Sequence, residues 1–492
     1  MEARGRIPPT LPRQNPTVSY WHDPLASIAN LRSTEELPQH ADYVIVGSGV
    51  SGVCIAWNIL EREKGAKVVM LEARTAVGGA TGRNGGHTKA ASYRSYINHA
   101  TAHGTTEAIR IAHLEAANIA ATHAFAKSHS IPCESRPCET VDVIYDAASY
   151  AAGVQAIGRM QADMGPHDPS AQYKTYDAES ARKTFLTPGE DVQGAFAYPA
   201  GSLSSYKFAI GILNLCLARG LNLQTMTPVT GIRGATPSSG VNGRWTAATP
   251  RGSISTPKLI LATNGYTAHL LPSLLGSIVP YRGQVIASAP SRTLESIVPS
   301  GLPTTYSFIY ASGYEYMIPR PHHSTSKEVP ADCQGDIVIG GGTARLPGEG
   351  VSEFGNTDDT VINELNSPYL RQTLPSYFGE NWGDAKATPV KKEWTGIMGA
   401  TKDGLPFVGG WPGAEGLWVS AGFNGHGMVL CLKCAEALVG MVFGEKVEGG
   451  SLDWFPRSFL LSSERVENGT FEGRVGMRAV SKEEEGKFQA KL

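Results

Sequence analysis

The sequence lacks an excess of charge of either sign. Its 43 Lys and Arg residues nearly balance its 45 Asp and Glu residues, so the formal net charge over 492 residues is −2. A near-neutral chain creates no long-range field that would recruit nucleic acid or an anionic membrane. The balance excludes these partner classes and favours a small molecule that is recognised locally.

Cysteines and uninterrupted apolar runs are also scarce. Seven cysteines is a low, odd count, and no basic-then-apolar segment of the secretory kind opens the sequence, so we expect a reducing, intracellular compartment without disulfides. The longest stretch without Asp, Glu, Lys or Arg, residues 259–281, is broken by Asn264, His269, Pro272 and Pro280. This pattern argues against a membrane span.

The last three residues carry a hint of localisation. Ala490-Lys491-Leu492 differs from the peroxisomal address Ser-Lys-Leu only by alanine in place of serine. We expect peroxisomal import, and the alternative is a cytoplasmic protein whose C-terminus is a frayed tail.

The composition is typical of a globular protein with a large core. Hydrophobic residues make up 41% and charged residues 18% of the chain, and its length predicts two domains. Residues 1–35 are proline-rich and aperiodic, which predicts an extended arm lying on the body. Residues 451–492 are polar and predict a solvated C-terminal tail.

A β-α-β unit follows the arm. Apolar strands at 43–46 and 67–71 flank a helical pattern at 51–63, and the turn before the helix reads Gly47-Ser48-Gly49-Val50-Ser51-Gly52. Gly47 permits a tight turn, Gly49 lets the backbone approach a pyrophosphate, and Gly52 lets the helix pack on the strand. Glu72, 20 residues after Gly52, can accept hydrogen bonds from a ribose. The unit predicts dinucleotide binding, and the alternative is a glycine-rich turn in another α/β protein.

Two further glycine-rich segments suit a larger ligand than a loosely held nicotinamide nucleotide. Residues 78–87 contain too many glycines for an ordinary helix, so their backbone is expected to run against a flat ligand or a second phosphate. Residues 421–428 lead into a predicted helix at 429–443, which offers another N-terminus to an anion.

At this point the sequence resembles the flavoprotein family of D-amino-acid oxidase, glycine oxidase and sarcosine oxidase, particularly its γ-glutamylputrescine-oxidase-like branch. The similarity runs from about residue 41 to 443, and the matching segments are 44–49, 82–86, 261–265, 401–406 and 422–427. The resemblance implies an α/β FAD-binding domain, Rossmann-like and of the glutathione-reductase type, interleaved with an α+β substrate domain on a mostly antiparallel sheet. It implies FAD-binding segments 36–98, 194–278 and 395–450, and substrate-domain segments 99–193 and 279–394.

The resemblance also implies where FAD lies. Val229 would touch the adenine, residues 263–265 would lie near the pyrophosphate or adenosine, and the turn at 425–428 would face the isoalloxazine. A helix N-terminus there would stabilise the negative charge of reduced flavin. The complete set of expected cofactor-binding residues is Gly47, Gly49, Val50, Ser51, Gly52, Glu72, Ala73, Arg74, Gly79, Ala80, Thr81, Arg83, Asn84, Gly85, Gly86, His87, Val229, Thr263, Asn264, Gly265, Gly404, Gly422, Asn424, Gly425, His426, Gly427 and Met428.

Two positions depart from better-known members of the family. Glycine and D-amino-acid oxidases hold the substrate carboxylate with an arginine where this chain has Met398, and a thioether cannot form such a pair. Unless Arg282, Arg320 or Arg345 reaches the site, an amine or larger metabolite is favoured over a simple α-amino acid. Sarcosine-oxidase-like members attach flavin through a cysteine where this chain has Gly396, so we expect non-covalent FAD, with attachment at His87 as the alternative.

Four side chains are candidates on the substrate side: Tyr316, Arg282, Met398 and His426. Tyr316 aligns with an active-site tyrosine of the D-amino-acid oxidase group, and its alternative is an aromatic that fills a sheet face. Arg282 lies where the chain crosses between domains, and its alternative is a domain-interface salt bridge. Cys431 and Cys434 have redox spacing but lie inside a predicted helix, so we expect core packing and no metal site.

The sequence thus predicts an FAD-dependent amine oxidase that transfers a hydride from a C–H bond beside nitrogen to flavin and passes the electrons to oxygen as hydrogen peroxide. Val338 aligns with the lysine that activates oxygen in sarcosine oxidases, which leaves a dehydrogenase or a tailoring oxidoreductase of a nitrogen-containing secondary metabolite as the alternative. A third hypothesis is a partner-binding module that acts through the N-terminal arm and holds FAD as a structural ligand. The substrate and the oligomeric state are left open.

Overall fold

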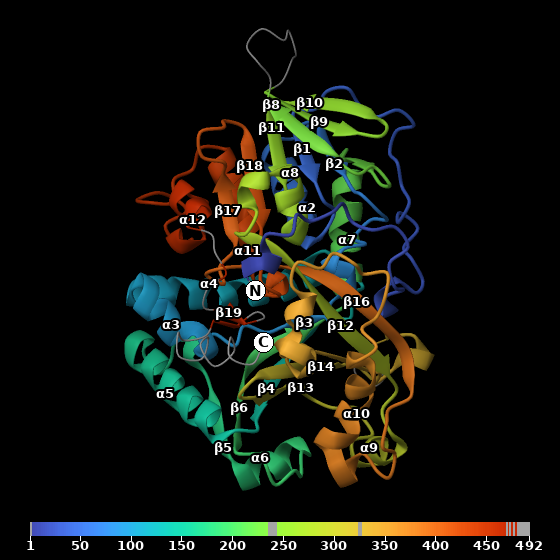
Figure 1. Ribbon diagram of the computed structural model, residues 1–492, viewed down its shortest axis with the longest axis vertical. Coiled ribbons are helices and arrows are strands. Elements are labelled where there is room, and N and C mark those ends of the chain that lie inside the picture. The colour runs from blue at the N-terminus through green and yellow to red at the C-terminus, as the bar shows by residue number, and fades with distance from the viewer. Residues whose placement is uncertain are drawn as a thin grey trace.

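The computed structural model describes residues 2–234, 244–322, 327–468 and 471, and two short strands, β19 (Arg474–Val475) and β20 (Arg478–Ala479). Ala490-Lys491-Leu492, the predicted peroxisomal address, lies outside the described residues. The described chain forms two main sheets with helices around and between them (Figure 1).

A six-stranded sheet occupies the upper part of Figure 1, in the order β17-β18-β11-β1-β2-β7. All of its neighbouring strands pair in parallel except β17 and β18. Its strands are short apolar runs because both faces are covered: helices pack on one face, and a small second sheet with residues 268–274 packs on the other. The strands are β1 (Tyr43–Val46), β2 (Val68–Leu71), β7 (Asn222–Gln224), β11 (Lys258–Leu261), β17 (Phe407–Gly410) and β18 (Leu417–Ala421).

Three helices pack together against this sheet. They are α2 (Val50–Arg62), α7 (Ser205–Ala218) and α11 (Gly427–Val442), and α2 contacts both of the others. Their apolar residues belong to one core cluster with β1 and β2. A small antiparallel sheet of β8 (Gly231–Gly234), β9 (Trp245–Thr249) and β10 (Gly252–Thr256) lies at the top of the molecule in Figure 1.

A nine-stranded sheet forms the lower part of Figure 1, in the order β16-β12-β15-β14-β13-β4-β6-β3, with β5 paired to β6. Every pairing is antiparallel except that of β4 with β13. The predicted fold class, a parallel dinucleotide-type sheet interleaved with a mostly antiparallel one, is confirmed. The strands are β3 (His87–Thr88), β4 (Arg136–Ile144), β5 (Lys174–Asp177), β6 (Gly194–Ser202), β12 (Ile278–Ser288), β13 (Thr305–Tyr310), β14 (Gly313–Pro319), β15 (Ile337–Gly340) and β16 (Val390–Thr401).

Helices connect the two sheets. The long helix α4 (Thr105–Ser128) contacts α11 beside the upper sheet, and it also contacts α3 (Tyr93–His103) and α5 (Ala147–Met164) beside the lower one. The remaining helices are α1 (Glu2–Gly5), α6 (Ala178–Phe185), α8 (Thr267–Leu270), α9 (Arg292–Ile297), α10 (Asn366–Phe378) and α12 (Ser463–Glu467).

The strand pairings move three of the predicted domain boundaries. β3 and β6 belong to the nine-stranded sheet although residues 36–98 and 194–278 were assigned to the FAD-binding domain. β16 runs across the predicted boundary at residue 395 and pairs along its length with β12. A sequence pattern identifies a strand but not the neighbour to which it bonds, so these crossings are visible only in the structure.

The N-terminal arm agrees with its prediction, whereas the C-terminal tail differs from its own. The N-terminal arm lies on the body, as expected, and buries Tyr20 and Trp21 of a 3₁₀ turn at Tyr20–His22. The predicted solvated tail does not begin at residue 451, because Leu452, Phe455 and Phe459 are buried in the core. These three apolar residues are spaced as on one face of a helix, but the polar composition of residues 451–492 as a whole hid them.

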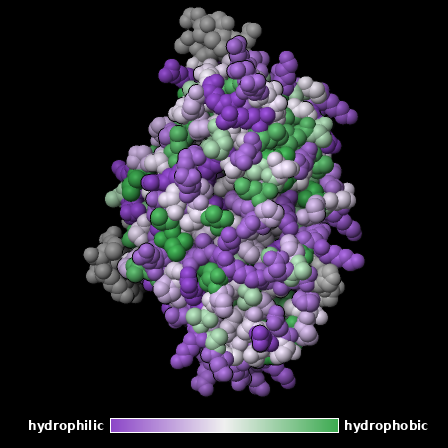
Figure 2. Space-filling view, turned by 90° about the vertical axis from the view of Figure 1, so that its right-hand side faces the viewer, coloured by the Kyte–Doolittle hydropathy of each residue, from purple (hydrophilic) through white to green (hydrophobic). Residues whose placement is uncertain are grey.

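The surface is mostly hydrophilic (Figure 2), and the cysteines form no disulfides in the structure. On the face shown in Figure 2, hydrophilic residues separate scattered hydrophobic patches. In the described part of the chain, no helix combines the length and the apolar character needed to cross a membrane. All seven cysteines are free, and Cys431 and Cys434 are buried in α11, as expected for core packing.

Candidate active site

A cavity of about 1390 Å³ lies between the two main sheets. Its walls come from the ends of β1, β2 and β11 on one side and from β12, β13, β14 and β16 on the other. The N-termini of α2 and α11 and the helices α3, α4 and α5 also contribute. The volume lies above the usual range for a single small ligand, so the cavity has room for a dinucleotide and a substrate together.

The glycine turn after β1 has the geometry that a close backbone approach requires. Gly47 has a φ of +106°, and a Cβ on Gly52 would lie 2.0 Å from the Gly47 carbonyl oxygen, so neither position admits a side chain. Gly49 has no side chain with which to cap α2, and of the amides at the helix start that of Val50 donates to the Thr81 hydroxyl at 2.9 Å. The other amides of the first turn lack a side-chain cap and suit an anion.

Glu72 at the end of β2 closes this turn. Its carboxylate accepts hydrogen bonds from the Ser48 amide at 3.0 Å, the Ser48 hydroxyl at 2.7 Å and the Arg74 amide at 2.9 Å. The side chain is buried but lines the cavity. The acid is thus held in a fixed position beside the turn, as ribose recognition requires.

The second glycine-rich segment forms a 3₁₀ turn, Ala80–Arg83, and then enters β3. Arg83 is 2% exposed and donates from Nε to the Thr395 carbonyl at 2.6 Å. Its Nη1 atom is buried and has no partner among the described residues, and the same holds for the hydroxyl of Tyr266. Both residues line the cavity. Buried donors without partners are rare and point to a ligand that is bound there.

The glycine turn before α11 is fixed to the middle of the chain by two asparagines. Asn264 Oδ1 accepts from the amides of Gly422 and Phe423 at 3.0 and 3.1 Å. Asn424, with a φ of +52°, accepts from the Thr401 amide at 2.8 Å and donates to the Gly422 carbonyl at 2.7 Å. These bonds bring three segments that are distant in sequence to one wall of the cavity.

Most of the sequence-predicted site residues line this cavity. Those that do are Gly47, Gly49, Val50, Ser51, Glu72, Ala73, Arg74, Gly79, Ala80, Thr81, Arg83, Asn84, Gly85, Gly86, His87, Val229, Thr263, Asn264, Tyr316, Met398, Gly404, Asn424, Gly425, His426, Gly427 and Met428. Gly52, Gly265 and Gly422 do not line it and instead permit close packing behind it. A Cβ on Gly265 would lie 2.4 Å from the Met398 carbonyl oxygen, and one on Gly422 would lie 2.5 Å from Thr401 Cγ2.

Arg282 does not reach the cavity, which corrects the prediction of a substrate contact. It is 8% exposed, pairs with Glu353 through two nitrogens, and donates from Nη1 to the Asp358 carbonyl at 2.9 Å. Its strand neighbours Tyr281 and Gly283 line the cavity, so alternation along β12 points Arg282 to the opposite face. The alternative of an internal salt bridge is what the structure shows.

Arg320 and Arg345 do not supply the missing arginine either, since neither lines the cavity. Arg320 is paired with Glu134 at 2.6 Å, and Arg345 stacks over the Tyr310 ring at 4.1 Å. Met398 does line the cavity, in register with Tyr281 of β12. The arginine expected by comparison with glycine oxidases is therefore absent from this wall.

Tyr316 and the two histidines lie on the wall in fixed positions. A Cβ on Gly85 would lie 2.6 Å from the Tyr316 ring, so the glycine pair makes room for this tyrosine. His87 Nε2 lies 2.6 Å from the Thr305 hydroxyl, and burial lowers the pKa of His87 well below its ordinary range. Burial also lowers the pKa of His426, whose Nδ1 lies 3.1 Å from the Asn424 carbonyl. Both imidazoles are neutral at neutral pH.

Sequence reasoning missed several charged residues on the cavity wall, among them Lys89, Arg94 and Glu115. Lys89 pairs with the fully buried Asp142 at 2.5 Å, which also accepts from the hydroxyls of Tyr93 and Tyr198. Arg94 lies on α3 and Glu115 on α4. A charged residue on an amphipathic helix is expected to face solvent, and only the tertiary packing shows that the exposed Arg94 and the buried Glu115 both line the cavity.

The N-terminal arm was also missed as part of the site. Thr10, Leu11 and Pro12 line the cavity. Farther along the arm, Thr17 accepts from Arg83 Nη2 at 2.6 Å through its hydroxyl, and Trp21 Nε1 donates to the Asn84 carbonyl at 2.6 Å. The arm thus contacts the same glycine-rich segment that forms the cavity wall.

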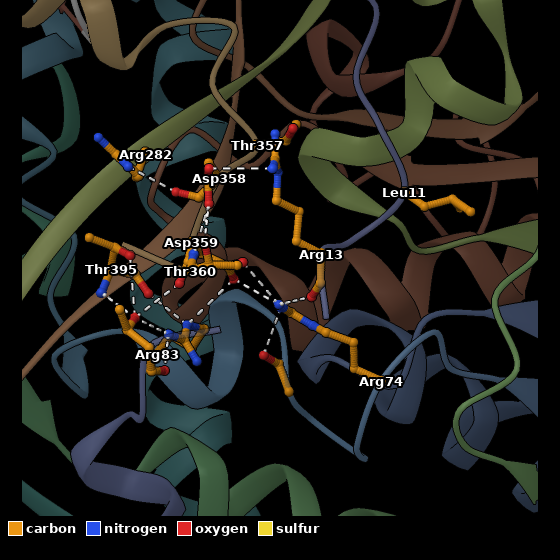
Figure 3. A network of polar contacts seen from close by, with 12 residues as sticks. Leu11, Arg13, Arg74, Arg83, Arg282, Thr357, Asp358, Asp359, Thr360 and Thr395 are labelled. Atoms are coloured by element: carbon orange, nitrogen blue, oxygen red, sulfur yellow. Dashed lines mark hydrogen bonds and ion pairs between the residues drawn. The ribbon is translucent and has the colours of Figure 1, made fainter. Parts of the chain in front are cut away.

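A buried carboxylate organises this region. Asp359 is fully buried and accepts from Arg74 Nη1 at 2.8 and 3.1 Å, and Arg83 Nε lies 3.7 Å from it. Its backbone carbonyl accepts from the Thr17 amide at 2.7 Å. Figure 3 shows Arg74 and Arg83 converging on Asp359, with Arg13 and Thr395 beside them. Asp359 therefore holds two cavity-lining arginines through its carboxylate and the arm through its backbone carbonyl.

The stability of the protein is expected to depend on pH through Glu115. Burial raises the pKa of Glu115 from 4.5 to about 7, and the Ser92 hydroxyl, which donates to it, only partly offsets this; the Tyr173 phenol is the nearby titratable group. Between these pH values the folded chain holds a proton that the unfolded chain releases. Stability should therefore fall as the pH rises from about 4.5 to about 7, by on the order of 3 kcal/mol from this group.

Glu115→Gln is expected to remove this part of the pH dependence. The measurement is denaturant unfolding of the FAD-loaded protein from about pH 5 to about pH 8. Glu436→Gln, which alters a partly exposed carboxylate paired with Lys433 at 2.7 Å, serves as the control and should keep the wild-type profile. A Glu115→Gln profile parallel to that of the wild type would show that Glu115 is ionised in the folded state at low pH.

Comparison with known proteins identifies the architecture around this cavity. A family model described as "DAO: FAD dependent oxidoreductase" matches residues 42–441. Glycine oxidase of Pseudomonas aeruginosa is 27% identical over 201 residues, which cover 40% of this chain and only 45% of that protein. Gamma-glutamylputrescine oxidoreductase of Escherichia coli (strain K12) is 23% identical over 400 residues, which cover 81% of this chain and 82% of that protein.

A solved structure gives the same result for the fold. Glycine oxidase from Geobacillus kaustophilus superimposes with a TM-score of 0.64 at 19% identity, covering 86% of this chain and 99% of that chain. At this identity the similarity shows a shared fold and leaves the substrate open.

Proposed function

Because this chain belongs to the DAO family of FAD-dependent oxidoreductases, we propose that it oxidises a carbon–nitrogen bond of an amine or amino-acid-like small molecule. The chain is an FAD-dependent enzyme of the amine and amino-acid oxidase type, and the family and branch predicted from the sequence are confirmed. The substrate, the electron acceptor and the roles of individual residues are proposals.

The observation that carries the proposal is the convergence of glycine turns from both ends of the chain on one cavity. The turn at Gly47–Gly52 and the turn at Gly422–Gly427 each lead into a helix, α2 and α11. The residues present fit FAD, because two helix starts suit its anionic groups and because Arg83 Nη1 and the Tyr266 hydroxyl are buried donors that find no partner in the described part of the chain.

We propose that the α2 turn holds the pyrophosphate, Glu72 the ribose, and the α11 turn the flavin end. When bound, FAD supplies the hydride acceptor for oxidation beside nitrogen. The chain's own residues bind and orient the substrate and exclude water. Tyr316 and Met398 form the substrate-side wall, and His87 and His426 contribute neutral imidazoles. The His87 contact with Thr305 and the lack of any sulfur at Gly396 support non-covalent binding.

Oxygen is the acceptor we propose, with release of hydrogen peroxide. Val338, which replaces the oxygen-activating lysine of sarcosine oxidases, is buried in β15 and does not line the cavity. Lys89, which directly follows β3, is a cavity-lining lysine, and Asp142 opposes the lowering of its pKa that burial causes. A dehydrogenase is the second candidate, and the absence of lysine at position 338 is what favours it.

The location in the cell stays a prediction. The matched relatives are bacterial proteins and give no support to peroxisomal import. The partner-module hypothesis is weakened because the arm is built into the cavity wall and so has a role within the chain itself.

The test is spectroscopic. Purified protein should be yellow and should release its flavin on acid precipitation, which reports non-covalent binding. Glycine and γ-glutamylputrescine, after the names of the relatives, and a panel of primary and secondary amines are mixed with it without oxygen. We expect bleaching of the flavin by at least one amine and rapid reoxidation on adding air. Bleaching without reoxidation would indicate the dehydrogenase, and a colourless protein that takes up no FAD would refute the proposal.

A further inference from the structure

The first turn of α11 points into the cavity. Its first five residues, 427–431, all line the cavity wall, whereas a helix that lies along a wall presents only every third or fourth residue. In the described part of the chain, no side chain caps the start of this helix. The N-terminal end therefore brings partial positive charge to the cavity, and this charge acts only within about one turn. Its effect on a ligand depends on where the first turn lies.

A buried asparagine holds this turn from behind. Asn118 lies on α4, is 1% exposed and does not line the cavity. Its Nδ2 donates to the Met428 carbonyl at 3.1 Å, and its Oδ1 accepts from the Lys433 amide at 3.0 Å. In a regular helix such groups bond within the helix itself. Here one side chain from another helix bonds to both and spans the first turn of α11.

The surroundings of Asn118 are those of an apolar core. Ile111 and Leu114 of α4 belong to the same hydrophobic cluster as Val429 and Leu430 of α11. An amide side chain costs free energy in such a place unless its donor and its acceptor are both hydrogen-bonded. An apolar residue would fill the space without this requirement. What asparagine adds is a directional link between α4 and the start of α11.

Other asparagines hold the segment just before this turn. Asn264 accepts from the amides of Gly422 and Phe423, and Asn424 donates to the Gly422 carbonyl. Asn118 acts on the other side, after the helix has begun. The start of α11 is thus fixed from both directions by side-chain hydrogen bonds to its backbone.

We propose that Asn118 is a positioning residue for the cofactor: it holds the first turn of α11 where the positive end of the helix stabilises negative charge on reduced flavin. The inference rests on the part of the proposed function that places the flavin end at the α11 turn. It goes beyond that function by naming a residue, remote from the cavity wall, that sets how strongly reduced FAD is favoured over oxidised FAD.

The test measures the reduction potential of bound FAD by equilibration with dyes of known potential, without substrate or oxygen. Asn118→Leu removes both hydrogen-bonding groups at similar volume. We expect the preference for reduced over oxidised FAD to fall about tenfold, which moves the two-electron potential about 30 mV more negative. Asn118→Ser, whose shorter side chain cannot span both backbone groups, should shift the potential in the same direction. Asn118→Gln keeps both groups and should shift it less.

A merely structural role for Asn118 predicts a different result. Loss of packing alone would weaken the binding of oxidised and reduced FAD equally, so the potential would not change although stability fell. The free energy of unfolding and the dissociation constant of oxidised FAD are therefore measured in parallel. Asn381→Leu is the matched control, because Asn381 donates to the Leu186 carbonyl at 3.1 Å and does not line the cavity. This variant should keep the wild-type potential.

The outcomes separate this inference from the proposed function. Wild-type potentials in both Asn118→Leu and Asn118→Ser would overturn the positioning role, whatever their stability. If amines bleach the flavin in that case, the proposed function stands without it. If the potential shifts in the Asn118 variants and not in Asn381→Leu, but no amine bleaches the flavin, the positioning role stands and the proposed reaction falls.

Discussion

Replacing Asp359 by alanine is expected to destabilise the folded protein by about 3–5 kcal/mol and to release FAD. The carboxylate is fully buried between Arg74 and Arg83, whose side chains are 6% and 1% exposed. Without it, two guanidinium charges are left close together and without solvent, and burial already lowers the pKa of Arg83. The measurements are denaturant unfolding and the dissociation constant of FAD by flavin fluorescence.

Two variants sharpen this prediction. Asp359→Asn keeps the shape and an acceptor but removes the charge, so its effect should lie between those of the wild type and the alanine variant. Asp358→Ala removes the neighbouring carboxylate, which is 28% exposed and pairs with Arg13 at 3.4 Å, and should cost less than about 1 kcal/mol. Equal effects of the two alanine variants would show that the buried network does not control the site.

Deleting residues 2–24 is expected to weaken FAD binding about a hundredfold or more. The deletion removes Thr10, Leu11 and Pro12 from the cavity wall, and it removes Thr17, which accepts from Arg83, and Trp21, which donates to the Asn84 carbonyl. Arg83 loses charge-assisted hydrogen bonds, each of which contributes about 1.5–3 kcal/mol, and its segment becomes free to move. The measurement is FAD retention after dilution and ultrafiltration.

A shorter deletion is the control for the arm. Removing residues 2–8 takes away α1 and the Arg4 bond to the Phe354 carbonyl but leaves the cavity wall intact, so FAD affinity should change only a few-fold. If the longer deletion retained FAD and turnover, and changed only the assembly state, the arm would be a partner-binding element after all.

The parts of the site that are encoded locally could be predicted from the sequence. The turn after β1 could be predicted from the spacing of Gly47, Gly49 and Gly52, because a side chain at Gly47 or Gly52 would collide with nearby backbone. The turn at 422–427 was recognisable for the same reason, since a glycine run before a helix has few other structural uses. The fold class followed from the resemblance to the flavoprotein family that these segments carry.

The parts that depend on tertiary packing could not be predicted. Arg282 lies on a strand whose neighbours line the cavity, and only its pairing with Glu353 shows that it points away. Arg94 and Glu115 lie on amphipathic helices in which a charged residue usually faces solvent. Asp359 follows an irregular segment, and no pattern in the sequence links it to Arg74, which lies 285 positions earlier.

The repeated passage of the chain between the two sheets has a consequence for evolution and for engineering. The chain crosses several times between the six-stranded sheet and the nine-stranded sheet, which contains β3, β6, β12 and β16. No contiguous fragment therefore encodes all the strands of either sheet. A prematurely terminated product would expose open strand edges, which favour aggregation. A single genetic crossover between two homologues would exchange pieces of both halves at once. Transplanting specificity between homologues therefore requires several coordinated replacements, and gradual divergence by point substitution is the easier route to a new substrate.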